Sequence, residues 1–500
     1  MQDASTHIAV IDIGRTNKKL LLYDLKLNPV DGAYATIADI PHGNENHEPI
    51  DATAAWFLNA LADMAASHRI ANITITTYGG AFVCLDEQGR VALPPLSGST
   101  DPGEDVQASF DALIGDPRRI QRRMATPRMP FLSVMARGIH YVKERYPELF
   151  ARTRTLINLP QYYGYLLTGQ TGNERTYMGT HTALWDFERM DWSEVRERLG
   201  VEALIPPTLS RAWEVLGTLT PQVARKTGLA PEVRVTMGIH DSNAAMVPFL
   251  IKQPEDFMLV STGSMCVVMH PEPGVRFREE DLGEMVYYNL NAFDGVFKTA
   301  LFVAGLEFDI YMGLLGGRHD RQDPPDIDPE LLADILGRRE EFILPAIVPF
   351  GMYLNSPARL VEGDQVYPLG DVFSGKGPRF LDDYERSCAL LTLSMALHTR
   401  KAMERAGHAP GMPVIIEGGF SHNALYTRLI ASLAPESPVM LTGLKEASAF
   451  GAALLGLAAH EGVSPHRLAE RFTLTTTRVP PFELPNLRAY VETFERRTQG

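Results

Sequence analysis

The strongest constraint on the fold is a strand–turn–strand unit that occurs twice, about half a chain apart. In the first unit, residues 8–24, two apolar runs flank a polar turn. In the second, residues 257–269, similar runs flank the turn Ser-Thr-Gly-Ser at 261–264. Each pattern predicts a β-hairpin. Because each hairpin heads one half of the chain, the repeat predicts two related domains, each opening with a turn that faces an anion.

The rest of the chain mixes helical and strand patterns. Its 500 residues exceed the roughly 250–300 that one hydrophobic core can serve, so at least two domains are expected. Strands alternating with helices predict an α/β class. We expect helices at 54–69, 139–150 (with a break at Pro147), 388–405 and 446–460, strands at 73–77, 82–85 and 233–237, and surface loops at 318–329 and 361–378.

Charge and composition exclude several classes of function. The formal net charge is −14, which disfavours nucleic acid and anionic membrane surfaces as partners. The three cysteines show no disulfide or zinc pattern, and the sequence has no apolar run of about 18 residues. The N-terminus does not resemble a secretory signal. These features predict a soluble, cytoplasmic protein.

Two aspartates stand at the ends of predicted strands. Asp12 precedes the first hairpin turn, where it could hold a hydrated Mg²⁺ ion while the turn and Lys18 or Lys19 bind phosphate. Asp241 follows a strand and precedes a helix, where it could accept a proton from a hydroxyl group. Taken alone, the first pattern also suits a solvated turn, and the second also suits a helix cap.

Two further turns could contact a nucleotide. The second hairpin turn, Ser261 to Ser264, offers N–H and O–H donors. Between a strand at 414–417 and a helix beginning near Ser421, Gly418 and Gly419 would let a ligand approach the backbone. This connection lacks the Walker and dinucleotide-binding patterns. No dinucleotide fingerprint follows the first strand either, which argues against a dehydrogenase. Each turn alone is equally typical of an ordinary connection.

The order of these four motifs resembles that of the FGGY carbohydrate kinases over roughly residues 8 to 460. In that family they correspond to the phosphate-1, catalytic aspartate, phosphate-2 and adenosine motifs. The resemblance implies an α/β, two-lobed sugar kinase/actin-like (ribonuclease H-like) fold with an interlobe cleft. It places a sugar-binding domain at 1–245 and a nucleotide-binding domain at 246–500. The boundary is expected near 238–257, and the helix at 446–460 near the hinge.

The resemblance also implies a role for individual residues. It implies ATP and Mg²⁺ as cofactors, a small-molecule sugar as substrate, and Asp241 as the catalytic base. By the same resemblance, Asp12 would hold Mg²⁺ through water. The sugar would be bound by Tyr78, Gly79, His240 and Asp241. The residues expected to bind nucleotide are Thr16, Asn17, Lys19, Thr262, Gly263, Gly418, Gly419 and Asn423.

Details of the motifs resemble the rhamnulokinase/fuculokinase branch. The pair His240-Asp241 and the run from Thr77 to Gly89 are similar to that branch, as is the segment 174–186. The resemblance implies phosphorylation of a 6-deoxy-ketose, such as L-rhamnulose or L-fuculose, at O1. In the first turn, Arg15, Asn17 and Lys18 replace hydroxyl residues of the family pattern. Rhamnulokinases often have an acid at the position of Ala81, so the sugar stays open.

Three alternatives remain: another ketose (L-xylulose or L-ribulose), a polyol, or an actin-like nucleotide-binding protein without sugar turnover. A homodimer is compatible with the resemblance.

Overall fold

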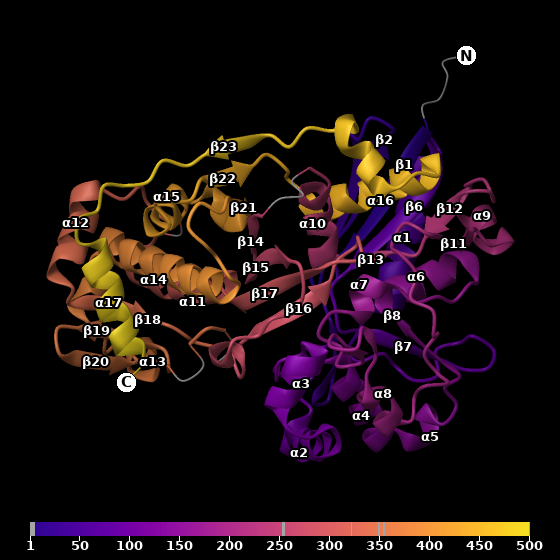
Figure 1. Cartoon of the computed structure of the whole chain (residues 1–500), viewed down its shortest axis with the longest axis horizontal. Coiled ribbons are helices and arrows are strands. Elements are labelled where there is room, and N and C mark those ends of the chain that lie inside the picture. The colour runs from indigo at the N-terminus through magenta and orange to yellow at the C-terminus, as the bar shows by residue number, and fades with distance from the viewer. Residues whose placement is uncertain (1–5, 253–255, 322, 349–350, 354–355, 500) are drawn as a thin grey trace.

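Two seven-stranded sheets organise the computed structural model, which describes residues 6–252, 256–321, 323–348, 351–353 and 356–499 (Figure 1). The first sheet contains β1 (Thr6–Ile13), β2 (Asn17–Asp24), β3 (Pro29–Thr36), β6 (Arg69–Thr77), β11 (Val215–Thr218), β12 (Arg234–Thr236) and β13 (Ile239–His240). The second contains β14 (Met258–Thr262), β15 (Met265–Glu272), β16 (Val286–Leu290), β17 (Val296–Val303), β21 (Val414–Gly418), β22 (Val439–Thr442) and β23 (Thr476–Arg478). Both predicted hairpins are confirmed, as β1–β2 and β14–β15.

The two sheets share one topology. In the first, β3, β2 and β1 are antiparallel, and β6 and β12 then continue in parallel with β1. In the second, β17, β15 and β14 are antiparallel, and β21 and β22 continue in parallel with β14. The carboxyl ends of β1 and β14 therefore occupy equivalent places in the two halves.

Helices and short strand pairs complete both halves. The helices of the first half are α1 (Ile50–Ala65), α2 (Gly103–Ile114), α3 (Pro117–Met124), α4 (Met135–Arg145), α5 (Pro147–Phe150), α6 (Leu159–Thr168), α7 (Arg175–Met178), α8 (Glu194–Leu199), α9 (Pro221–Thr227) and α10 (Asp241–Lys252). Those of the second half are α11 (Gly305–His319), α12 (Pro329–Arg338), α13 (Leu369–Phe373), α14 (Tyr384–Arg405), α15 (Ala424–Leu433), α16 (Ala447–Glu461) and α17 (Leu487–Thr498). The small sheets are β4 (Ile40–His42) with β5 (Glu45–His47), β7 (Phe82–Leu85) with β8 (Thr155–Asn158), β9 (Trp185–Asp186) with β10 (Asp191–Trp192), and β18 (Glu341–Leu344) with β19 (Arg359–Glu362) and β20 (Gln365–Pro368).

The first sheet is covered on both faces. Strand β1 is an almost continuous apolar run, which is typical of a strand buried on both sides. Because successive side chains alternate between faces, Ile11 joins a core with Phe57 of α1, while Val10 joins a second core with Leu455 of α16. The sheet is therefore held rigidly, and its strand ends are fixed in place.

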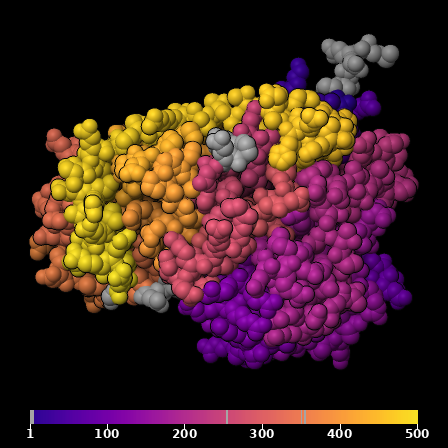
Figure 2. Space-filling view, viewed as in Figure 1, coloured from indigo at the N-terminus to yellow at the C-terminus, as the bar shows by residue number. Residues whose placement is uncertain are grey.

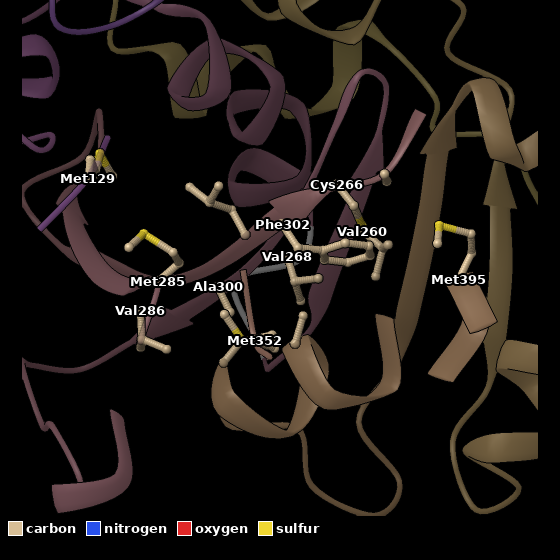
Figure 3. Close-up of a cluster of buried hydrophobic side chains, with 14 of the residues drawn as sticks. Met129, Val260, Cys266, Val268, Met285, Val286, Ala300, Phe302, Met352 and Met395 are labelled. Carbon is tan, nitrogen blue, oxygen red and sulfur yellow. The ribbon is translucent and has the colours of Figure 1, made fainter. Parts of the chain in front are cut away.

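The core of the second sheet lies against α14. Figure 3 shows Val260 of β14, Val268 of β15 and Phe302 of β17 gathered on one side of the sheet, and Met395 of α14 belongs to the same cluster. The helix was expected at 388–405 and begins four residues earlier, where Asp383 caps it.

Two helices connect the halves by crossing between them. Helix α10 leaves the first sheet, and its Met246 and Phe249 pack in a core with Leu259 of β14. Helix α16 follows β22 of the second sheet but lies against β1, β6 and α10 (Figure 1). In Figure 2 yellow residues of the C-terminal part of the chain border the magenta part of the first half. The small residues of α16 permit the contact, because a Cβ atom on Gly451 would lie 1.8 Å from the backbone oxygen of Ala244.

The mixed α/β class is confirmed, but one of the two loop predictions is wrong. The stretch 361–378 contains strand β20 and helix α13, since its polar residues lie on an exposed hairpin. The loop predicted from residue 318 begins after His319, where α11 ends. Among the described residues, no helix is both long and apolar enough to cross a membrane.

Candidate active site

Asp12 lies at the buried carboxyl end of β1. Its neighbours across the sheet are Lys19 on β2 and Thr76 on β6. The hydroxyl of Ser448 on α16 donates a hydrogen bond of 2.8 Å to Asp12 Oδ2. Burial raises the pKa of Asp12 to about 6, against the opposing effects of Lys19 and Ser448, and the charge of Asp241 raises it further. The negative charge of the Asp12 carboxylate is therefore only partly balanced by the positive charge of Lys19.

Lys19 is the cation nearest to Asp12. Its ammonium group donates a hydrogen bond to Glu446, the residue directly before α16. Burial lowers the pKa of Lys19, but the hydrogen bond and the charges of Glu446 and Asp12 outweigh it, so the pKa is raised and Lys19 stays charged. Helix α16 thus supplies two groups to the end of β1, although it lies more than 400 residues away in the sequence.

Lys18 has a different role from its neighbour. Its buried ammonium group donates to the backbone oxygens of Arg15 and Ile37, at 2.6 and 2.7 Å. These bonds brace the hairpin turn from inside. Of the two lysines expected to reach phosphate, Lys19 is the one that couples with Asp12, while the exposed Thr16 and Asn17 form the rim of the turn.

Asp241 begins α10 and is partly open to solvent, with 31% of its side chain exposed. Its Oδ1 accepts a hydrogen bond of 2.5 Å from the backbone N–H of Ser242. Burial of the carboxyl group raises its pKa to about 6, which the hydrogen bonds from Ser242 and the charge of Arg15 partly oppose. The group is therefore a carboxylate at neutral pH and more basic than an ordinary aspartate, as a proton acceptor requires.

His240 lies behind Asp241. Its Nε2 is 3.3 Å from Asp241 Oδ1, and its Nδ1 is 3.5 Å from the amide nitrogen of Asn243. Burial lowers the pKa of His240 to about 3, so the ring is neutral. Because an amide N–H only donates, Nδ1 accepts from Asn243, and the neutral ring carries its proton on Nε2, beside Asp241.

A buried network holds His240 and the loop 78–81 in place. Glu174 caps α7 and accepts a hydrogen bond of 2.6 Å from Thr176, whose hydroxyl receives the backbone N–H of His240. The hydroxyl of Tyr177 donates a hydrogen bond to the backbone oxygen of Ala81 at 2.8 Å and accepts one from the backbone N–H of Ala81 at 3.0 Å. The segment 174–186 thus positions the predicted sugar site from behind.

Tyr78 and Gly79, both predicted to bind sugar, lie in this loop. The hydroxyl of Tyr78 donates to Glu48, a buried carboxyl group whose pKa burial raises to about 7. The guanidinium of Arg15 lies 5.2 Å from the centre of the Tyr78 ring. The Tyr78 hydroxyl is therefore engaged inside the protein. Gly79 faces the imidazole rings of His181 and His240. A Cβ atom on Gly79 would lie 2.8 Å from Nε2 of His181 and 2.9 Å from Nε2 of His240.

The equivalent end of β14 meets the predicted adenosine motif. The hydroxyl of Thr262 donates to the backbone oxygen of Glu417 and accepts the N–H of Phe420. Its single proton is thus used within the protein, which differs from the expectation that this hydroxyl donates to a phosphate. Gly418 has φ = 82°, and a Cβ atom there would lie 1.9 Å from the oxygen of Thr262. Gly418 thus allows β21 to approach this turn.

Three further residues, Asn423, Gly263 and Gly419, complete this edge. Asn423 caps α15 by accepting the N–H of Tyr426 at 3.0 Å, so its side chain orders the helix start. The helix begins at residue 424 instead of near 421, because a short 3-10 turn, Gly419–His422, comes first. Gly263, Gly418 and Gly419 are exposed at the surface of this edge. They leave backbone accessible where a nucleotide was expected.

Several residues of the site were not predicted. They are Glu446 directly before α16, Ser448 on α16, Thr176 and Tyr177 on α7, His181 after it, Glu48, and Tyr287 on β16. Glu446 and Ser448 are the polar residues at the start of an otherwise small-residue, apolar helix. This contrast was the signal in the sequence that could have identified them as site residues. The others are separated from their partners by loops whose path the sequence does not reveal.

Both halves of the chain match models of known protein families. Residues 7–248 match the FGGY family of carbohydrate kinases, N-terminal domain. Residues 254–465 match the carbohydrate kinase FGGY, C-terminal domain.

Individual relatives have low sequence identity to the chain. An L-fuculokinase from Salmonella typhi is 22% identical over 457 residues, with 90% of this chain and 91% of that protein covered. A rhamnulokinase from Yersinia pestis (strain Pestoides F) is 27% identical over 206 residues, with 39% of this chain and 41% of that protein covered.

Solved structures resemble the whole chain. A carbohydrate kinase from Novosphingobium aromaticivorans superposes with a TM-score of 0.79 at 25% identity, covering 99% of both chains. A xylulose kinase from Lactobacillus acidophilus superposes with a TM-score of 0.80 at 14% identity, covering 99% of this chain and 97% of that one. The second likeness shows a shared fold.

Proposed function

Because the chain belongs to the FGGY family of carbohydrate kinases, we propose that it transfers the γ-phosphoryl group of ATP to a ketose, with Asp241 accepting the proton of the attacking hydroxyl. The observation that carries this assignment is the position of Asp241. It is a partly exposed carboxylate with a raised pKa, and it couples electrostatically to Asp12 at the first hairpin turn. A base near the phosphate turn can deprotonate a hydroxyl as phosphoryl transfer begins.

The nucleotide is proposed to lie between the two hairpin turns. Exposed backbone at Gly263, Gly418 and Gly419 suits the close approach of a ligand. Thr16, Asn17 and Lys19 border the phosphates, while Thr262 and Asn423 shape the turns that carry these glycines. This arrangement assigns the sugar to residues 1–245 and the nucleotide to residues 246–500, with α16 of the second segment returning to complete the first sheet.

Asp12 is the residue that would hold Mg²⁺ with the nucleotide. The donor set suits this ion, because Asp12 is a carboxylate facing further negative charge from Asp241 and Glu446. No cluster of three or more His, Cys, Asp or Glu side chains able to hold a metal occurs among the described residues. Mg²⁺ usually keeps several waters and takes one or two carboxylates plus phosphate oxygens. When bound, it would neutralise phosphate charge.

For the acceptor we propose a 6-deoxy-ketose, such as L-fuculose or L-rhamnulose, phosphorylated at O1. The support comes from the relatives, one an L-fuculokinase and another a rhamnulokinase, and from the pair His240-Asp241. His240 presents an N–H beside the catalytic carboxylate, where it can bind a sugar hydroxyl. A kinase that uses ATP in this way is expected to work in the cytoplasm.

A coupled ADP-release screen tests the proposed substrate. The panel contains L-fuculose, L-rhamnulose, L-xylulose, L-ribulose, an aldose and a polyol, each compared by kcat/KM. We expect a 6-deoxy-ketose to rank first. A polyol or aldose that exceeds every ketose about tenfold, a gap of roughly 1.4 kcal/mol in transition-state binding, would refute the deoxy-ketose assignment.

The raised pKa of Asp241 predicts the pH dependence of turnover. Only the carboxylate form accepts a proton, so kcat/KM should be flat above pH 7 and fall as pH drops through about 6. Below that pH, kcat/KM should fall about tenfold per pH unit if Asp241 is the one group that must be ionised. Burial also raises the pKa of Asp12 to about 6, so the fall should be steeper if Asp12 must be ionised as well. The profile is measured from pH 4.5 to 8.5, with folding followed at each pH. A folded enzyme with undiminished kcat/KM at pH 5 contradicts the assignment of the base.

A further inference from the structure

His181 occupies a strained position beside the proposed sugar site. It follows α7, in the segment 174–186 that positions the site, and its φ is 27°. The proposed function gives no role to its side chain. Non-glycine residues rarely adopt a positive φ, although histidine does so more often than most. Such strain persists only where the surroundings enforce it, and it is concentrated at functional sites. The ring contacts of His181 show what enforces it here.

The Nδ1 atom of His181 is anchored to the backbone. It lies 2.9 Å from the carbonyl oxygen of Ser133. A carbonyl oxygen can only accept, so Nδ1 carries a proton. Burial lowers the pKa of His181 to about 4, with a further contribution from His240, so the ring is neutral near pH 7. Nε2 of His181 therefore presents a lone pair and is a hydrogen-bond acceptor.

This acceptor faces the same point as the N–H of His240. A Cβ atom on Gly79 would lie 2.8 Å from His181 Nε2 and 2.9 Å from His240 Nε2, so both nitrogens converge on the Gly79 backbone. His240 Nε2 in turn lies 3.3 Å from the carboxylate of Asp241. The acceptor nitrogen of His181 and the donor nitrogen of His240 therefore lie close together, beside the proposed base Asp241.

The ring of His181 is also held by its neighbours. It makes edge contacts with His240, at 6.1 Å between ring centres, and with Tyr287, at 6.0 Å. Tyr287 belongs to β16 of the second sheet, and Leu290 on the same strand bonds the backbone of Gly179 at 3.0 Å. Both halves of the chain therefore fix the direction of Nε2, and little rotamer entropy is lost when a ligand binds.

We infer that His181 is a specificity-determining residue that accepts a hydrogen bond from a hydroxyl of the sugar. The inference rests on the proposed function and extends it, because it adds an acceptor to the donor that His240 supplies. A sugar hydroxyl both donates and accepts, so one hydroxyl can bridge the two imidazoles, or two neighbouring hydroxyls can bind one each. The substrate class is therefore a polyhydroxylated ketose with a free hydroxyl at this position, rather than one deoxygenated there.

Two substitutions of His181 separate this role from a structural one. His181→Asn keeps an amide donor near Nδ1 for Ser133 but removes the acceptor at Nε2, and asparagine tolerates positive φ well. His181→Gln can place an amide oxygen near Nε2 but gives up the bond to Ser133. Sugar binding through Nε2 predicts that Asn is the more harmful change to KM for the sugar. A purely structural role predicts that Gln is the more harmful change.

The experiment uses the full chain and the ketose that the wild-type protein prefers. We expect His181→Asn to raise KM for the ketose about tenfold, the value of one hydrogen bond, with KM for ATP and the unfolding temperature unchanged. Analogues of that ketose lacking one hydroxyl each should reveal one position whose loss weakens the wild type but no longer weakens His181→Asn. His319→Asn is the control, because His319 also bonds a carbonyl, that of Leu381 at 2.8 Å, but lies at the far end of α11.

The outcomes are distinguishable. If the wild type phosphorylates the ketose and His181→Asn has the same KM and the same analogue ranking, the inference about His181 is wrong and the kinase assignment stands. If His181→Gln is the more harmful variant, with a lowered unfolding temperature, the residue is structural and the inference again fails. If the wild type phosphorylates no sugar in the panel, the proposed function fails, and with it the role of His181.

Discussion

Replacing Asp241 by asparagine is expected to lower kcat by about 10²–10⁴-fold, the usual contribution of a general base. The amide oxygen of asparagine can still accept the backbone N–H of Ser242, so the start of α10 is preserved. It can no longer take up a proton from the attacking hydroxyl. We therefore expect the folded structure and nucleotide affinity to be retained while turnover is lost.

The measurement is steady-state kcat for the preferred ketose, together with ATP affinity by calorimetry and the unfolding temperature. Asp364→Asn is the matched control, because Asp364 is an exposed carboxylate in the β19–β20 turn and the same chemical change there should leave kcat unaltered. Turnover by Asp241→Asn within a few-fold of wild type would show that the proton leaves by another route.

The second large effect is expected at the crossing of α10 and α16. Alanine is the better helix former, so intrinsic propensity alone would make Gly451→Ala stabilising by about 0.5–1 kcal/mol. The added Cβ atom would lie 1.8 Å from the backbone oxygen of Ala244, and a backbone cannot rotate away as a side chain can. We therefore expect a net destabilisation of about 3 kcal/mol, as for a strongly overpacked core. Because α16 also carries Ser448 and Glu446, kcat should fall as well.

The free energy of unfolding is measured by urea titration for Gly451→Ala and for a control helix glycine. Gly313 on α11 serves as the control, since a Cβ atom there would meet nothing within 4 Å. Gly313→Ala should be neutral or slightly stabilising. If Gly451→Ala behaved like Gly313→Ala, the close contact between the crossing helices would not be needed for stability.

The hairpins could be predicted because they are local. Each depends on two apolar runs joined by a short turn, and in the first hairpin this pattern sets the strand end that carries Asp12. The helix at 446–460 was also predicted, with its place near the hinge. Its packing on the first sheet was not, because no local pattern reveals which of two similar sheets a buried, small-residue helix covers.

Hydrogen-bond partners were the part of the site that sequence could not supply. Thr262 and Asn423 have the side chains that a nucleotide site needs, yet their polar atoms bond the protein's own backbone. Conversely, His181 lay in a segment noted only for resemblance, and its position beside Gly79 depends on a positive φ and on a contact with Ser133. The partners of Thr262 and His181 lie 155 and 48 residues away in the chain, so the tertiary structure decides those pairings, whereas the bond of Asn423 to Tyr426 is a local helix cap.

The product of the reaction tests the central claim most directly. The full chain is incubated with ATP, Mg²⁺ and the ketose that ranks first in the ADP-release screen, and the mixture is followed by ³¹P NMR. The account predicts a phosphomonoester coupled to the protons of the terminal C1, formed in equal amount with ADP and absent with Asp241→Asn. Release of inorganic phosphate alone, with or without the ketose, would contradict it and would favour an actin-like nucleotide-binding protein that does not phosphorylate sugar.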